Sequence, residues 1–131
     1  MNFHDIGEIT WAWVERTFGS EIAYNNEERA LRLLEETLEA YQTLGGDKDH
    51  ALRLVHEVFG RPYDNDYGKE LAQVGMIFAA LCSQMGLDPM IIVRDEMMRV
   101  LAVDPKKPRA RMLEKIERGV SHARKNQLPS V

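Results

Sequence analysis

A cluster of glutamates is the part of this sequence whose residue types and spacing could do chemistry. Glu35, Glu36 and Glu39 are three and four residues apart, which places neighbouring carboxylates on one face of a helix. Crowded like charges repel, so such a cluster serves either solubility or the binding of a cation. Carboxylate oxygens suit hard cations, and Mg²⁺ is typically held by one or two carboxylates together with substrate phosphates.

A fourth acid, Glu70, lies on the apolar side of a later helical segment. It precedes Val74 by four residues and Ile77 by seven, so it shares their helix face. A carboxylate that faces a core is unfavourable unless it is paired or bound to a metal. Two interpretations stay open: an ion pair with an arginine such as Arg32 or Arg53, or a magnesium site shared with the first cluster.

The first cluster has its own ordinary interpretation. Charged runs on helices are commonly solvated faces, and here the charge would be balanced by Arg29 and Arg32. The cation site instead requires a second helix or a second subunit to cover this face. The apolar stripe on the opposite side of the same helix consists of Leu34, Leu38 and Tyr41.

The elements that position these acids are helical nearly throughout. No useful strand alternation is found, and short loops favour an all-α, antiparallel four-helix-type bundle with additional short helices. The Asp104–Pro108 segment is expected to be a basic linker. The expected helices run from about Ile6 to Gly19, from Asn25 or Asn26 to Gly45, from Asp47 or Asp49 to Phe59, from 67 to 85, from Pro89 to about Leu101 and from 109 to 123.

Bulk properties limit the function classes. The 131 residues suit one domain, expected over 1–125, with a frayed tail over 126–131. A net charge of −4 argues against nucleic acid as a partner. The single cysteine, Cys82, excludes an intrachain disulfide and fits a buried structural thiol in a reducing compartment. No signal peptide and no apolar stretch of membrane-spanning length is seen, so we expect a cytoplasmic protein with no membrane partner.

At the acidic residues the chain resembles the MazG-like nucleoside triphosphate pyrophosphohydrolases of the all-α NTP-PPase superfamily. The family pattern is Glu-Glu-x-x-Glu on one helix and Glu-x-x-Asp on a later one. The first half matches in full, as Leu-Leu-Glu35-Glu36-Thr-Leu-Glu39-Ala, and the second in part, as Lys-Glu70-Leu-Ala-Gln73. The following Val-Gly-Met-Ile-Phe-Ala-Ala-Leu-Cys also resembles one subgroup, and the resemblance covers about residues 5 to 102.

The resemblance implies Mg²⁺-dependent hydrolysis of an NTP or dNTP to the monophosphate and pyrophosphate, with Mn²⁺ as an alternative cation. It implies that Glu36, Glu39 and Glu70 are metal ligands. It gives Glu35 and Glu39 a catalytic role at the attacking water. It also implies a homo-oligomer, either a dimer or a tetramer.

Gln73 departs from the pattern, because the family usually has Asp there. A neutral amide oxygen binds a hard cation more weakly than a carboxylate, unless Asp66, one turn before Glu70, substitutes. The alternative function is therefore a catalytically weakened MazG-like module that binds nucleotide or regulates. A third hypothesis is a helical adaptor whose acids only solubilise.

A basic cluster offers candidate ligands for the substrate's phosphates. The functional interpretation is a clamp on the β and γ groups, and the ordinary one is a solvated linker. The cluster consists of Lys106, Lys107, Arg109 and Arg111.

Overall fold

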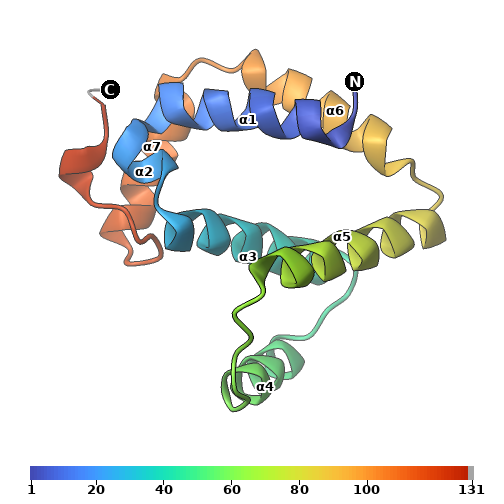
Figure 1. Ribbon diagram of the computed structural model, residues 1–131. Coiled ribbons are helices and arrows are strands. Elements are labelled where there is room, and N and C mark those ends of the chain that lie inside the picture. Colours follow the sequence, from blue (N-terminus) through green and yellow to red (C-terminus); the bar gives the residue numbers. More distant parts are fainter. Residues whose placement is uncertain (130–131) are drawn as a thin grey trace. The chain divides into compact units, whose positions relative to one another are not determined.

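The computed structural model describes residues 1–129, and the regular secondary structure in this part of the chain is all helical (Figure 1). It contains α-helices and one short 3₁₀ turn and no strand, which confirms the all-α prediction. The elements are α1 (Phe3–Phe18), α2 (Ser20–Ala23), α3 (Asn26–Thr43), α4 (Lys48–Phe59), α5 (Tyr67–Gln84), α6 (Pro89–Leu101), α7 (Lys106–Glu117) and η1 (Lys125–Gln127).

Side-chain caps explain where four of these helices begin. In each, a short polar side chain accepts a hydrogen bond from the backbone N–H three residues further on, which satisfies a donor that has no partner inside the helix. At the start of α1 the cap is reciprocal, because Asp5 also accepts from the cap residue's N–H. The capping residues are Asn2, Asn25, Asp47 and Asp66.

The C-terminal quarter differs from the prediction in one place. The expected linker is wrong, because α7 already begins at Lys106 and ends at Glu117. Pro108 falls in its first turn, where the missing N–H of proline is tolerated, and its side chain is buried. Beyond α7, Lys125–Gln127 forms η1 and Leu128 packs on the core. The frayed tail expected over 126–131 stays a prediction, and 130–131 lie outside the described residues.

The chain divides into two compact units, which are described separately. Unit 1 combines residues 1–34 with the described residues from Met90 onward, and unit 2 is Glu35–Pro89. Helix α3 therefore begins in unit 1 and ends in unit 2. The single domain expected over 1–125 stays a prediction.

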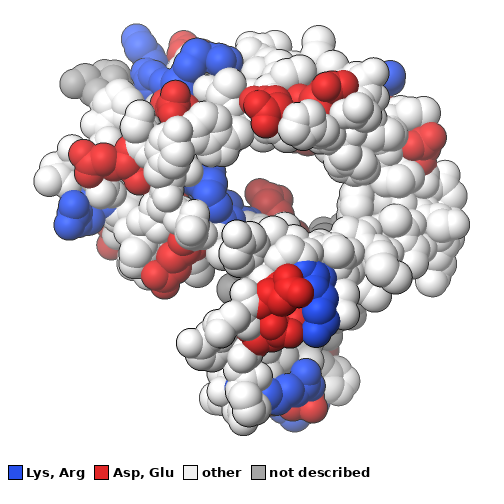
Figure 2. All heavy atoms as spheres, viewed as in Figure 1, with Lys and Arg blue, Asp and Glu red and all other residues white. Residues whose placement is uncertain are grey.

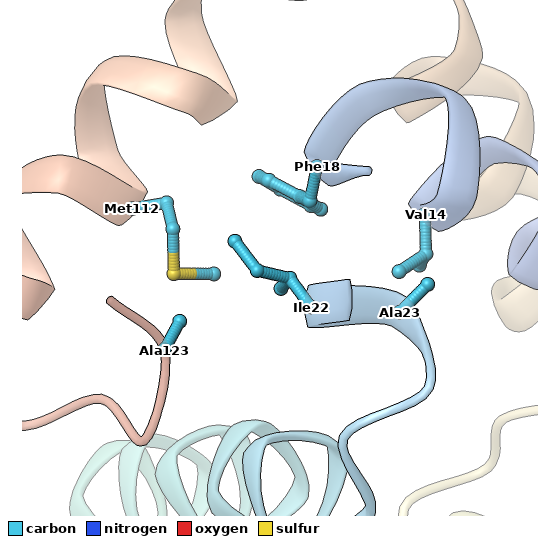
Figure 3. Packing of buried hydrophobic residues seen from close by; sticks show 6 residues of the cluster. All are labelled: Val14, Phe18, Ile22, Ala23, Met112 and Ala123. Atoms are coloured by element: carbon cyan, nitrogen blue, oxygen red, sulfur yellow. The ribbon is translucent and has the colours of Figure 1, made fainter. Parts of the chain in front are cut away.

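The hydrophobic core lies in unit 1 (Figure 3). Side chains from α1, α2, α7 and the C-terminal segment, by which we mean residues 118–129, pack together. Trp13 packs edge-on against Phe18 at the border of this core. Gly19 makes the turn from α1 to α2 at φ 86°, a left-handed conformation that only glycine adopts readily. The core residues are Val14, Phe18, Ile22, Ala23, Met112 and Ala123.

A buried carboxylate at the start of α3 accepts hydrogen bonds from the C-terminal segment. Glu28 is fully buried, and its Oε2 accepts hydrogen bonds from Ser121 Oγ at 2.8 Å and from the His122 N–H at 2.7 Å. Its Oε1 lies 3.2 Å from Nε of Arg32, a distance suited to an ion pair although the N–H is not aligned for a hydrogen bond. The Arg32 guanidinium also donates to the Val120 carbonyl. Charge and hydrogen bonds thus join segments almost a hundred residues apart.

Two further groups belong to this network. Nε and Nη2 of Arg29 are buried without a hydrogen-bond partner among the described residues, and burial lowers the pKa of this guanidinium while the charge of Glu28 opposes that shift. The His122 ring lies between Asn25 and Glu27, with Nε2 2.9 Å from the Glu27 carboxylate.

Unit 2 has almost no core of its own. Within it, Cys82 is the buried residue, which confirms the predicted buried thiol. The large apolar side chains of its helices and loops are instead between 37% and 88% exposed.

Among the described residues, no single helix is long and apolar enough to cross a membrane. Only when the consecutive helices α5 and α6 are counted together do they reach the length and apolar composition of a membrane span.

Candidate acidic site in unit 2

The three acids of the first cluster lie on α3, on the side away from its apolar stripe. Glu36 and Glu39 are exposed and Glu35 is half-buried. Within unit 2 this helix therefore presents carboxylates on one side and Leu38 and Tyr41 on the other, as the spacing predicts.

Glu70 lies in the first turn of α5, where a carboxylate is favoured by the helix dipole. The residues that share its side of the helix form what we call the α5 apolar face. This face is itself exposed, and Glu70 with it, so the predicted burial of Glu70 is wrong for one chain. The α5 apolar face consists of Val74, Ile77, Phe78 and Leu81, with Glu70 at its start.

Asp66, the predicted substitute ligand, is the N-cap of α5. Its Oδ1 accepts from the Lys69 N–H at 3.0 Å, and its own N–H donates to Asp64 at 2.7 Å. Asp64 accepts two hydrogen bonds that lower its pKa from the usual value. The one from the Asp66 backbone N–H has the larger effect, and the one from the Lys69 ammonium the smaller. Asp66 thus already positions the helix that carries Glu70. Gln73 is exposed one turn further along.

The donor types suit Mg²⁺, because all four glutamates offer anionic oxygens. In the described part of a single chain, however, no three His, Cys, Asp or Glu side chains lie together as a cation site. The acids of α3 and the acid of α5 share one compact unit but do not form one cluster within it.

An open hollow of about 750 Å³ lies on the apolar side of α3, between the C-terminal end of that helix, the start of α4 and one residue of α5. Gly46 allows the Tyr41 ring to lie against the backbone here, because a Cβ at this position would meet the ring at 2.3 Å. The hollow is therefore on the other side of α3 from the acids. Its lining residues are Thr37, Ala40, Tyr41, Leu44, Gly45, Gly46, Asp47, His50 and Leu81.

The basic candidates lie on α7 in unit 1 rather than in a linker. Lys106, Lys107 and Arg111 are exposed. Arg109 is half-buried, and its Nε donates to the Thr17 carbonyl at 2.8 Å, which ties α7 to the end of α1. Arg109 therefore has a structural role that the charge pattern alone did not reveal.

Sequence reasoning missed the structural importance of Glu28. Its place in the first turn of α3 indicates only a favourable interaction with the helix N-terminus, yet its side chain is fully buried in unit 1. One sequence feature could have indicated an ion pair at Glu28, namely Arg32, which lies four residues later on the same helix face. Its partners Ser121 and His122 come from a distant segment and leave no local pattern.

Comparison with known proteins finds no match among family models, among curated proteins or among solved structures.

Proposed function

We propose that this protein is a Mg²⁺-dependent, MazG-like pyrophosphohydrolase, which converts a nucleoside triphosphate to the monophosphate and pyrophosphate. The observation that carries the proposal is in unit 2: three carboxylates share one side of α3, and Glu70 stands exposed at the start of α5. Glu36, Glu39 and Glu70 would hold the cation. Bound Mg²⁺ neutralises triphosphate charge and lowers the pKa of a coordinated water.

The chain's own residues have separable roles in this reaction. Water adds to the α-phosphorus, the bond from that phosphorus to the bridging oxygen breaks, and pyrophosphate leaves. Glu35 and Glu39 orient the water and accept its proton. The phosphate-binding role predicted for exposed cations such as Lys106 stays a prediction.

Pyrophosphate release across a panel of NTPs and dNTPs with Mg²⁺ tests the proposal. We expect release by the wild-type chain and at least about a hundredfold less by Glu70→Gln, which keeps the side-chain shape but removes the charge that holds the cation. The matched control is Glu117→Gln, an exposed glutamate at the end of α7 in unit 1. Absence of release from every nucleotide would exclude the activity.

The second candidate is a nucleotide-binding or regulatory module, and Gln73 favours it. The amide is exposed one turn after Glu70 and adds no charge to the cation site. Tight nucleotide binding without hydrolysis, unchanged by Gln73→Asp, would support this function. A faster hydrolysis in Gln73→Asp would support the pyrophosphohydrolase, and would mean that Gln73 is a weak cation ligand in the wild-type chain.

A further inference from the structure

Positive charge is concentrated in the last part of the chain. Residues 105–131 contain eight Lys and Arg and two acids, which gives +6, whereas the nine Lys and Arg and nineteen acids of residues 1–104 give −10. The net charge of −4 is therefore an average of two regions of opposite sign, an asymmetry typical of proteins that bind polyanions. We propose that the basic region binds the phosphate backbone of double-stranded nucleic acid. This inference is independent of the proposed function.

Six of the eight cations form what we call the basic surface, which lies in unit 1. All six are exposed, and none makes an ion pair with any of the described residues. The other two, Arg109 and Lys115, are half-buried. Half of the basic surface belongs to the C-terminal segment and so lies outside the cluster considered for the substrate's phosphates. The basic surface consists of Lys106, Lys107, Arg111, Arg118, Arg124 and Lys125.

Several exposed cations elsewhere already have an acidic partner. A paired cation must give up that partner to bind another anion, whereas an unpaired one loses only loosely held counterions. The basic surface therefore keeps its charge for an external anion. The paired cations outside it are found in Arg61–Glu57, Lys69–Asp64, Arg94–Asp95 and Arg99–Glu96.

Helix α7 arranges part of the basic surface as a stripe. Lys107, Arg111 and Arg118 are separated by four and seven residues, which places them on one side of the helix. This side is opposite Ile116, which packs against the core. One acid, Glu114, lies on the same side as the stripe. Figure 2 shows Lys and Arg side chains gathered beside the start of α7. A packed helix thus holds the backbone of these cations in place before any anion binds, which reduces the ordering that binding requires.

The composition of this region favours a duplex over other polyanions. Residues 105–131 contain no Phe, Trp or Tyr, so no aromatic ring of this region stacks on unpaired bases as in single-strand-binding proteins. The apolar side of α7 packs in the core through Met112, so it is not free to enter a lipid bilayer as amphipathic surface helices do. Contacts between cations and phosphates remain, and these supply essentially all of the sequence-independent affinity for duplex nucleic acid.

Fluorescence anisotropy of a short labelled DNA duplex, titrated with the full chain at a series of salt concentrations, tests the proposal. We expect a Kd of about 10⁻⁴–10⁻⁶ M at physiological salt. The logarithm of the binding constant should fall linearly with the logarithm of the salt concentration. Its slope should be about −0.9 for each phosphate contact, and so at most about −5 for six contacts.

A triple variant of the basic surface should reduce the magnitude of this slope by up to about 2.7, because three phosphate contacts are lost. The variant combines Arg118→Gln, Arg124→Gln and Lys125→Gln. Its matched control removes the same charge from exposed positions on or beside α4 in unit 2 and should keep the wild-type slope. The control combines Lys48→Gln, Arg53→Gln and Arg61→Gln.

Three outcomes would overturn the proposal. The first is no binding of the duplex even at low salt, and the second is an equal slope for the basic-surface variant and its control. The third is binding to vesicles of phosphatidylserine and phosphatidylcholine without binding to the duplex, which would assign the surface to a membrane instead. Arg118→Lys with Arg124→Lys keeps both charges and should bind as wild type, and circular dichroism checks that each variant folds.

Discussion

Unit 1 and unit 2 are built from similar amphipathic helices but differ in what those helices bury. In unit 1, Ile22 is 0% exposed, because α7 and the C-terminal segment pack over α1 and α2. In unit 2, Ile77 occupies a comparable position on an apolar helix face and is 71% exposed. The difference shows that amphipathicity identifies the apolar side of a helix but not whether another segment packs on it.

The two units also differ in whether their carboxylates are buried. Unit 1 buries Glu28 within a network of donors, whereas the carboxylates of unit 2 stand on its surface, mostly exposed. Figure 2 shows charged side chains near the start of α5 and few over the rest of that helix, whose sequence after Glu70 carries none.

The largest expected effect comes from the buried carboxylate. Glu28→Ala should lower the free energy of unfolding by about 3–5 kcal/mol, because it removes a buried counter-charge beside Arg32 and the acceptor of the hydrogen bonds from Ser121 and His122. Urea denaturation followed by tryptophan fluorescence measures it in unit 1, since Trp11 and Trp13 both lie on α1.

The matched control for this variant is Glu117→Ala, an exposed glutamate of the same unit, which should change the free energy of unfolding by less than about 0.5 kcal/mol. A loss below about 1 kcal/mol in Glu28→Ala would show that the network is not a centre of stability.

The next effect compares one substitution in both units. Ile22→Ala should lower the free energy of unfolding by about 2–5 kcal/mol, because it leaves a cavity in a packed core. Ile77→Ala should change it by less than about 0.5 kcal/mol in dilute solution, where its side chain is already in water. Fluorescence reports unit 1 and circular dichroism reports all helices, so a midpoint that differs between the two probes would show that the units unfold separately.

A smaller effect compares two helix caps. Asn25→Ala and Asp66→Ala each remove a side-chain acceptor, which typically lowers stability by about 0.5–2 kcal/mol. Asn25 should be at the upper end of that range, because its side chain also contacts His122. Hydrogen exchange separates the sites: Asn25→Ala should expose amides at the start of α3, and Asp66→Ala those at the start of α5. The same protection pattern in both variants would contradict independent units.

Local patterns predicted most of the secondary structure, because caps and breakers act over three or four residues. Asp47 and Asp66 begin α4 and α5, and Gly19 ends α1, close to where their residue types indicate. Helix α7 begins within the segment expected to be a basic linker, because a first helical turn accepts proline.

Less of the candidate site than of the secondary structure could be predicted from the sequence. Spacing correctly put the acids of α3 on one side and Glu70 among apolar residues, but whether those sides meet depends on contacts between distant segments. Glu28 is the clearest case, because its partners lie more than ninety residues away. A periodic pattern contains no information about such partners.

The smallest effect contrasts two acids whose pKa values are lowered for different reasons. In unit 2, the pKa of Asp64 is lowered first by the Asp66 backbone N–H and then by the Lys69 ammonium. In unit 1, the pKa of Glu96 is lowered chiefly by its hydrogen bond from Arg99. Each acid therefore contributes stability that is complete above its unfolded pKa, about 3.9 for Asp and 4.3 for Glu. That contribution is lost as the pH falls through the lower folded value.

Carbon-13 NMR titration of the side-chain carboxyls separates these causes. Arg99→Gln should return the pKa of Glu96 to its ordinary range, because the side chain it removes is the main cause. Lys69→Gln should return the pKa of Asp64 only partway, because the loop backbone still donates to it. Full recovery in Lys69→Gln would mean that the turn before α5 is not held by this hydrogen bond. The start of the helix that carries Glu70 would then be less ordered than the geometry indicates.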